Sequence, residues 1–289
     1  MFLSVIQATV NGLLLGTMYA LLAVGLDLIF GILGIVNFAY GDFLMIAMFA
    51  VYFALVGLHT NLVVAGLLAI VPTCLFGILL WKGIIGIGKD QERQMLATLG
   101  LSTILINVGN LVLTPDPRTV SSTLTSTTLS FGGIHVVGEV LLGGLIMGAL
   151  VVAIMLIVRR TIYGIRLRAL AANEVAARLY GIDDRSILLL TILLSSLCLA
   201  AVAAVLLPNY SVSPTVGLDF TLIAYMAVIL GGMGTIVGPA LAGMLIGVVQ
   251  TVGGLWLQGS LPQTLVALCF LLVVSFHPTG LFGRRTFGR

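Results

Sequence analysis

Residues 1–26 read MFLSVIQATVNGLLLGTMYALLAVGL, a stretch that contains no Lys, Arg, Asp or Glu. A helix needs about 20 mainly apolar residues to cross the hydrocarbon core of a bilayer, so this stretch predicts a membrane span. A secretory signal peptide would place Lys or Arg before a shorter apolar core. We therefore interpret these residues as a permanent first span.

The composition of the rest of the chain agrees with a membrane protein. The 289 residues are 60% hydrophobic and 8% charged, with a mean hydropathy of +1.23, whereas about a quarter of the residues are charged in ordinary soluble domains. So few charged side chains cannot cover a water-exposed surface of this size, which excludes the soluble enzyme classes. The apolar runs are continuous and do not alternate with polar residues, which excludes an outer-membrane barrel.

Polar breaks divide the chain into nine apolar runs, each of which predicts a transmembrane helix. The fold class we expect is an all-α polytopic helical bundle of the inner membrane, with about 8–10 transmembrane helices, interrupted helices and a cytoplasmic helix. One transmembrane domain would cover residues 1–289. The runs are 5–30, 43–58, 62–81, 95–113, 140–158, 187–207, 220–236, 240–256 and 261–276.

The basic residues predict the orientation, because Lys and Arg in short loops stay in the cytoplasm. All of them except Arg118 lie in three segments, at 82–93, 159–185 and 284–289. Nine spans place these segments on one side, with the N-terminus outside and the C-terminus cytoplasmic. The loop at 159–186 is then cytoplasmic and the loop at 114–139 is outside. Basic residues at membrane borders form no patch for nucleic acid.

Two glycine-rich stretches predict interruptions of helices, at 31–42 and 231–239. Interrupted helices are tolerated in a membrane where the freed backbone groups face protein or a water-filled path. Asp27 lies at membrane depth, either on such a path or at a helix end near the interface. The candidate residues of the translocation pathway are Asn11, Asp27, Asn37, Asp42, Gly231, Gly232 and Gly234.

Pairs of glycines four residues apart predict close helix packing, because this spacing places both on one helix face. The pairs are Gly12/Gly16, Gly144/Gly148, Gly234/Gly238 and Gly243/Gly247. The stretch Gly83–Lys89 follows the first seven positions of a P-loop, but Asp90 stands where Ser or Thr should hold magnesium. We find no catalytic or metal-ligating pattern and expect no enzyme activity, metal or cofactor in this chain.

The cytoplasmic loop contains Ala169–Gly181, which reads as one helix of about three turns made of strong helix formers and closed by a glycine. Such a short helix has little stability alone. Its small side chains favour a groove of another protein as its binding place. The alternative is an amphipathic helix that lies on the lipid headgroups.

Several spaced stretches resemble one family, the LivH type of branched-chain amino-acid permeases of bacterial ATP-binding-cassette importers. The first half carries Asn11–Leu26, Phe30–Asp42 and Ala97–Ser102. The second half carries Arg168–Ile182, Leu230–Gly234 and Pro278–Gly283. The sequence departs from the family pattern at Asp27, Tyr40, Asn173 and Val237.

The resemblance implies a permease that translocates branched-chain or other small neutral amino acids into the cytoplasm. Its expected partners are a second homologous permease, two cytoplasmic ATP-binding subunits that use ATP and magnesium, a periplasmic substrate-binding protein and membrane lipid. By the same resemblance, Arg168–Ile182 is the coupling helix, with Arg168, Ala169, Asn173, Glu174, Ala177 and Gly181 as its coupling residues. The alternatives are a permease for urea or short amides and a proton-coupled secondary transporter that uses Asp27 or Asp42.

Overall fold

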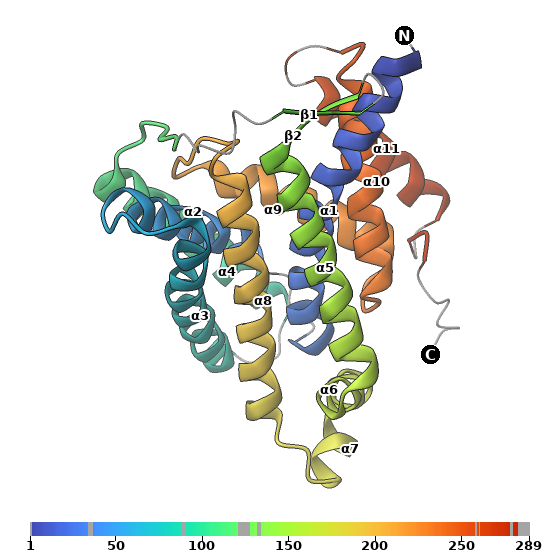
Figure 1. Ribbon diagram of the computed structural model, residues 1–289. Coiled ribbons are helices and arrows are strands. Elements are labelled where there is room, and N and C mark those ends of the chain that lie inside the picture. The colour runs from blue at the N-terminus through green and yellow to red at the C-terminus, as the bar shows by residue number, and fades with distance from the viewer. Residues whose placement is uncertain are drawn as a thin grey trace. The chain divides into compact units, whose positions relative to one another are not determined.

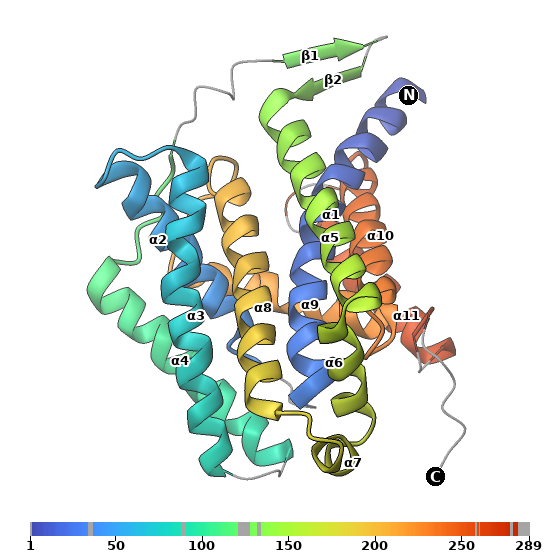
Figure 2. The ribbon, with the colours of Figure 1, turned by 60° about the horizontal axis from the view of Figure 1, so that its bottom comes forward.

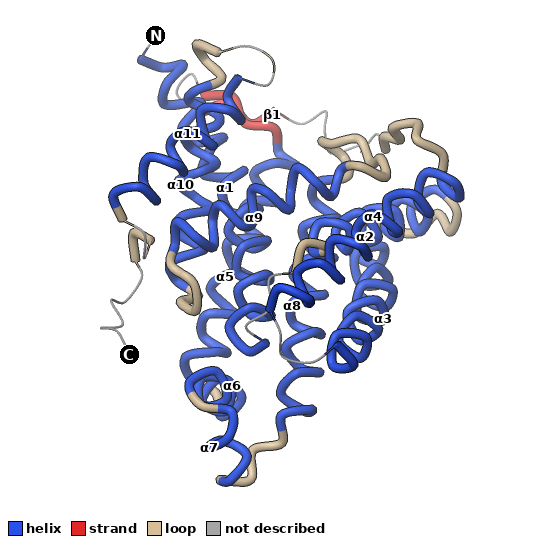
Figure 3. The backbone as a smooth tube through the Cα atoms, turned by 180° about the vertical axis from the view of Figure 1, so that it is seen from behind, coloured by secondary structure: helices blue, strands red, loops and turns tan. Residues whose placement is uncertain are grey.

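The computed structural model describes residues 2–33, 37–87, 91–120, 128–131, 134–257, 259, 261–277 and 280–282. The expected cytoplasmic tail at 284–289 lies outside the described residues, as do Lys89 and Asp90 of the P-loop-like stretch. Figure 1 labels the elements along the chain, and Figure 3 shows that helices make up most of its described part.

The elements follow one another as α1 (Phe2–Leu33), α2 (Tyr40–Val56), α3 (Leu62–Ile87), α4 (Gln91–Leu113), β1 (Thr128–Phe131), β2 (Ile134–Val137), α5 (Gly138–Arg160), α6 (Ile162–Ala172), α7 (Glu174–Leu179), α8 (Asp184–Leu206), α9 (Val216–Gly231), α10 (Val237–Gly253) and α11 (Leu261–Phe276).

Nine of these helices coincide with the nine predicted runs, which confirms a polytopic helical membrane fold. Five of them, α1, α3, α4, α5 and α8, are long and apolar enough to cross a membrane. The other four, α2, α9, α10 and α11, are apolar helices of 16 or 17 residues. At 1.5 Å per residue these span about 25 Å, slightly less than the hydrocarbon core. Three of the four border a predicted interruption.

The chain forms two compact units, which we describe separately. Unit 1 comprises Met1–Asp27, Ser121–Ala153 and Ile223–Arg289, and unit 2 comprises Leu28–Val120 and Ile154–Leu222. Three helices, α1, α5 and α9, run from one unit into the other. The assignment of the whole chain to one permease domain stays a prediction.

In unit 1, α1 and α10 pack closely through the glycines that the four-residue spacing singled out. A Cβ atom on Gly16 would lie 2.7 Å from the Cα atom of Met244, and one on Gly243 would lie 2.7 Å from the Cα atom of Ala20. No side chain fits at such a distance from a backbone, so glycine at these positions lets the two helices approach. Gly144 packs against Leu14 of α1 in the same way. Gly234 differs from the prediction, because it lies outside any helix.

In unit 2, α3 packs against both α2 and α8, and Figure 2 shows these helices side by side. Small residues again allow the approach, since a Cβ atom on Gly66 would lie 3.2 Å from the Cβ atom of Ala204. Toward the end of α3, Trp81 packs with Leu188 and Ile192 of α8. The core of unit 2 is therefore the seam between α2, α3 and α8.

The expected outside segment differs in part from the prediction. As predicted, α4 ends at Leu113, before Pro115. The sequence predicted only an outside loop over 114–139, whereas β1 and β2 form an antiparallel hairpin within it, with Thr128 opposite Val137. The β-branched residues of this segment favour a strand, which its Ser- and Thr-rich composition obscured.

Candidate translocation and coupling sites

The predicted coupling helix is two helices in the structure. We expected one helix over Ala169–Gly181, but α6 ends at Ala172 and α7 begins at Glu174. Asn173 has an extended backbone, with φ −158° and ψ 102°, and its side-chain oxygen accepts a hydrogen bond from the N–H of Ala176. Asparagine competes with the helical backbone in this way and starts a new helix as its N-cap. The prediction of one continuous helix was wrong for this reason.

Gly181 closes α7, as the sequence predicted. Its φ is +77°, a conformation that glycine adopts without the steric cost of a Cβ atom. The N–H of Gly181 donates to the carbonyl of Arg178, and the N–H of Ile182 donates to the carbonyl of Ala177. These two bonds form a Schellman motif, which satisfies the last carbonyls of the helix.

Two contacts fix α6 to the membrane-spanning helices. Arg168 donates a hydrogen bond to the carbonyl of Val158 in the last turn of α5, where carbonyls have no helical partner. The hydroxyls of Tyr163 in α6 and Thr191 in α8 lie 2.8 Å apart and share a hydrogen bond. Arg168, predicted as a coupling residue, thus holds α6 to α5, and a movement of α6 would move both α5 and α8.

Three apolar side chains of α7 and its C-cap are exposed: Val175 by 69%, Leu179 by 84% and Tyr180 by 89%. In contrast, the predicted coupling residues Ala177 and Ala169 are buried and half-buried. The sequence interpretation did not include Val175, Leu179 or Tyr180, whereas three residues that it did include, Arg168, Asn173 and Gly181, are also exposed. Apolar residues four positions apart, outside any span, were the signal that could have identified Val175 and Leu179. We call Val175, Leu179 and Tyr180 the α7 surface.

The charges near α7 are paired locally. Arg178 donates to the carboxylate of Asp184 at 2.6 Å, while Asp183 caps α8 by accepting hydrogen bonds from the hydroxyl of Ser186 and the N–H of Arg185. The bond from Ser186 holds the pKa of Asp183 below its ordinary value. These contacts fix the return of the chain from α7 into α8.

Asp27 lies at the glycine-rich break between α9 and α10. It is 2% exposed, and its carboxylate accepts a hydrogen bond from the N–H of Gly234 at 3.0 Å. Gly232 and Gly234 have φ values of +91° and +79°, so the break is a turn that needs glycine. The prediction of an interruption here is confirmed, and the structure brings Asp27 together with Gly234.

Gly231 and Gly238 face each other across this turn, so closely that a Cβ atom on either would overlap the backbone of the other. The segment after α11 also reaches it, since the N–H of Leu281 donates to the carbonyl of Leu230 at 2.7 Å. Two separate stretches of the family resemblance therefore meet in unit 1. Asn11, also in unit 1, is half-buried in α1.

Asn37 and Asp42 lie in unit 2, at the break between α1 and α2, and both are 1% exposed. Asp42 lies in the first turn of α2, where the helix dipole favours a carboxylate. Among the described residues its oxygens have no hydrogen bond of ordinary geometry, and the hydroxyl of Ser102 is the polar group beside them. The predicted pathway residues are thus divided between the two units, with Asn37 and Asp42 in unit 2 and the others in unit 1.

The break between α1 and α2 also packs against α9. A Cβ atom on Gly217 would lie 2.5 Å from the carbonyl oxygen of Gly41, and the N–H of Gly41 donates to the hydroxyl of Thr221 at 3.0 Å. Both breaks are therefore held by side-chain oxygens that accept from a glycine N–H. In the described residues, no three His, Cys, Asp or Glu side chains come together as metal ligands.

Nine apolar helices, two glycine-rich breaks and a helical segment outside the spans define a polytopic helical membrane protein. The family described as branched-chain amino acid transport system / permease component matches residues 8–275, and the chain belongs to this family. The family resemblance inferred from the sequence is thereby confirmed.

Curated relatives cover almost the whole chain. BraD of Pseudomonas aeruginosa, a high-affinity branched-chain amino acid transport system permease protein, is 29% identical over 295 residues, which cover 96% of each chain. LivH of Escherichia coli K12, described in the same words, is 28% identical over 98% of this chain and 97% of the relative. The probable LivH of Methanocaldococcus jannaschii is 25% identical over 94% and 91%. The family and these relatives are named for transport, not for enzyme activity.

Proposed function

We propose that this chain is the transmembrane permease subunit of an ATP-binding-cassette importer, and that it translocates branched-chain or other small neutral amino acids into the cytoplasm. The proposed partners are a second homologous permease, two cytoplasmic ATP-binding subunits and a periplasmic substrate-binding protein. ATP and magnesium are used by the ATP-binding subunits. The chain lies in a bacterial inner membrane with its C-terminus in the cytoplasm. The names of the relatives support the substrate class.

The proposal rests mainly on the exposed apolar surface of the α6–α7 segment and on the hydrogen bonds that join this segment to the spans. A helix whose Val175, Leu179 and Tyr180 are not covered by the rest of the chain has an apolar surface that a partner protein would cover. This segment is also fixed to α5 by Arg168 and to α8 by Tyr163. An ATP-binding subunit that binds the α7 surface would move α7 and α6 when it changes conformation. Because α6 is bonded to α5 and α8, these two spans would move with it.

We propose that transport proceeds by alternating access. The binding protein delivers the amino acid from outside, and ATP binding in the partner subunits moves the α6–α7 segment and, through α5 and α8, the spans. The two glycine-rich breaks supply backbone that can line a path without being exposed to lipid. The binding protein selects the substrate, so the path itself needs little affinity.

The experiment compares Leu179→Glu with Ile165→Glu in the purified complex reconstituted in proteoliposomes. Both residues are exposed and apolar, at 84% and 57%, but only Leu179 belongs to the α7 surface. Burying a carboxylate against an apolar groove is unfavourable, so we expect Leu179→Glu to release the ATP-binding subunits and abolish ATP-dependent uptake. Ile165→Glu should retain both. Normal assembly and uptake with Leu179→Glu would refute the proposed coupling surface.

Urea or a short amide remains the alternative substrate class. Excess unlabelled urea or acetamide, added with the matching binding protein outside, should leave leucine uptake unchanged if amino acids are the substrate. Competition by urea, with no competition by isoleucine or valine, would favour the alternative.

A further inference from the structure

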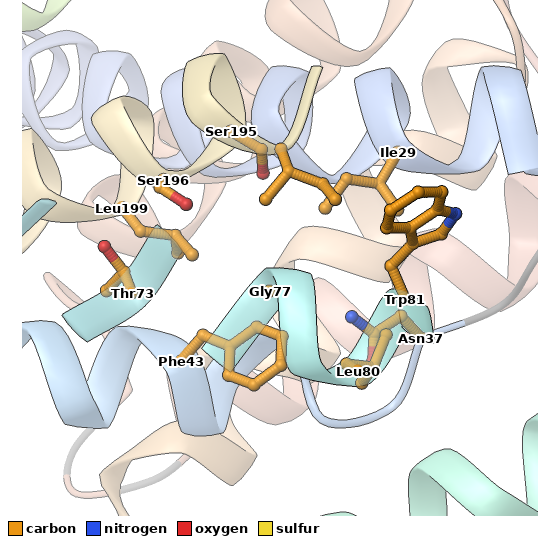
Figure 4. Close-up of a pocket in the computed structure, with 11 residues that line it drawn as sticks. Ile29, Asn37, Phe43, Thr73, Gly77, Leu80, Trp81, Ser195, Ser196 and Leu199 are labelled. Carbon is orange, nitrogen blue, oxygen red and sulfur yellow. The ribbon is translucent and has the colours of Figure 1, made fainter. Parts of the chain in front are cut away.

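Unit 2 contains a small cavity beside the break between α1 and α2 (Figure 4). Asn37 and Phe43 line one side, Gly77 and Trp81 of α3 a second, and Ser196 and Leu199 of α8 a third. The space open to the centres of water-sized molecules is about 20 Å³. Since a water molecule needs about 10–15 Å³ by this measure, the cavity has room for one.

The amide of Asn37 has a fixed orientation. Its oxygen accepts a hydrogen bond from the N–H of Ala39 at 3.1 Å, so the nitrogen must be the other end of the amide. Figure 4 shows that nitrogen directed into the space between the labelled side chains. Asn37 is 1% exposed, and among the described residues its nitrogen has no hydrogen-bond partner. Buried amide donors in proteins are hydrogen-bonded as a rule, to protein or to ordered water.

The hydroxyl of Ser196 supplies a second polar group, and Figure 4 shows it directed toward the same space. Ser196 is 3% exposed and lies within hydrogen-bonding reach of Cys74. A hydroxyl can accept one hydrogen bond and still donate another. The remaining walls are mostly apolar side chains, and no lining residue is charged.

These features restrict the chemistry of the ligand. A zwitterionic amino acid would find no opposite charge here, and burying its charged groups without partners is unfavourable. The ligand is therefore uncharged, has the size of a water molecule and carries a hydrogen-bond acceptor for the Asn37 nitrogen. We propose that this cavity is a hydration site in which one water molecule accepts a hydrogen bond from the Asn37 nitrogen.

The site lies between the break that follows α1 and helix α8, since Asn37 and Ser196 both line it. Ser196 lies five residues after Thr191, whose hydroxyl bonds to Tyr163 of α6. The site thus belongs to the helix that is hydrogen-bonded to the α6–α7 segment. Its existence does not depend on the proposed transport function, and it can be tested on the full chain alone.

Trp81 serves as the reporter, since it lines the cavity and the chain has only one other tryptophan, the exposed Trp256. Indole fluorescence is brighter in D₂O than in H₂O where water reaches the ring. We would measure this intensity ratio for the full chain with Trp256→Phe, in detergent. Deuteration of the indole nitrogen contributes equally in every variant, so differences between variants report the cavity.

Two variants fill the cavity independently. Ser196→Val replaces the hydroxyl with a methyl group and adds a second one. Gly77→Ala adds a Cβ atom 2.8 Å from the Cγ2 atom of Ile192, which also lines the cavity and must shift to make room. The control is Cys198→Val, which enlarges a buried residue of α8 that does not line the cavity.

We expect each filling variant to lower the D₂O-to-H₂O intensity ratio relative to the parent chain, while Cys198→Val keeps it. If Ser196→Val does not fold, Gly77→Ala decides the question alone. An unchanged ratio in the folded filling variants, or an equal loss in the control, would overturn the hydration site.

Discussion

The contact between Asp27 and Gly234 leads to a prediction that separates two roles of this buried carboxylate. If Asp27 carries a proton in a secondary transporter, Asp27→Asn abolishes transport. If Asp27 holds the turn between α9 and α10, the asparagine oxygen can still accept the hydrogen bond from the N–H of Gly234. We therefore expect Asp27→Asn to transport and Asp27→Ala to fail.

The magnitude follows from the structure. Asp27→Ala removes an acceptor at 3.0 Å and leaves the N–H of Gly234 without its partner at a buried position. A hydrogen bond to a charged group contributes about 1.5–3 kcal/mol, so we expect the free energy of unfolding to fall by about 2 kcal/mol. At about 2 cal/mol/K per residue, this corresponds to a decrease in Tm of about 3 °C for this chain. Asp27→Asn should lower the stability by less than about 1 kcal/mol.

The assay combines thermal unfolding of the purified chain with ATP-dependent uptake in proteoliposomes. We expect Asp27→Asn to keep most of the uptake and to be insensitive to uncouplers, and Asp27→Ala to lower both Tm and uptake. Loss of uptake in Asp27→Asn at an unchanged Tm would refute the positioning role and favour the proton carrier.

Three further predictions test the packing and the coupling segment. Tyr163→Phe removes one hydrogen bond between α6 and α8, which contributes about 1 kcal/mol to stability. The complex should still assemble, but the uptake per ATP hydrolysed should fall. An unchanged ratio of uptake to ATP hydrolysis would contradict the role of this bond. Gly243→Val places a side chain against the backbone of Ala20 and should lower the free energy of unfolding by about 1–3 kcal/mol. Gly100→Ala is the control, because nothing lies within 4 Å of its Cβ atom, and it should raise the free energy of unfolding by about 0.5–1 kcal/mol. Equal unfolding midpoints of the two variants would refute the packing argument. Gly181→Ala forces a Cβ atom into a left-handed conformation at about 1–2 kcal/mol, so α7 should fray and the affinity for the ATP-binding subunits should fall, as a binding titration would show.

Most of the helices could be predicted from local patterns in the sequence. Continuous apolar runs between polar breaks predicted all nine helices that the structure shows in those positions, because a span needs length and hydrophobicity and nothing from distant residues. The glycine pairs of α1 and α10 likewise predicted close packing. They did not reveal that α1 and α10 are each other's partners, which depends on the three-dimensional arrangement.

Contacts between residues far apart in the chain could not be predicted from the sequence. Asp27 and Gly234 are separated by 207 positions, and nothing in either stretch indicates the other. The division of the cytoplasmic helix at Asn173 was missed for a different reason. The flanking alanines favour one helix, and the capping preference of a single asparagine overrides them. The exposed apolar face of α7 was indicated in the sequence only by the four-residue spacing of Val175 and Leu179, which the sequence interpretation did not use.

The central claim is that this chain transports amino acids as part of a machine driven by ATP. The most direct measurement is uptake of radiolabelled leucine into proteoliposomes that contain the chain, its co-purified partners and the binding protein, with and without ATP inside. We predict uptake that requires both ATP and the partners, and that unlabelled isoleucine and valine reduce. Equal uptake by the chain alone without ATP would contradict the account and identify a secondary transporter.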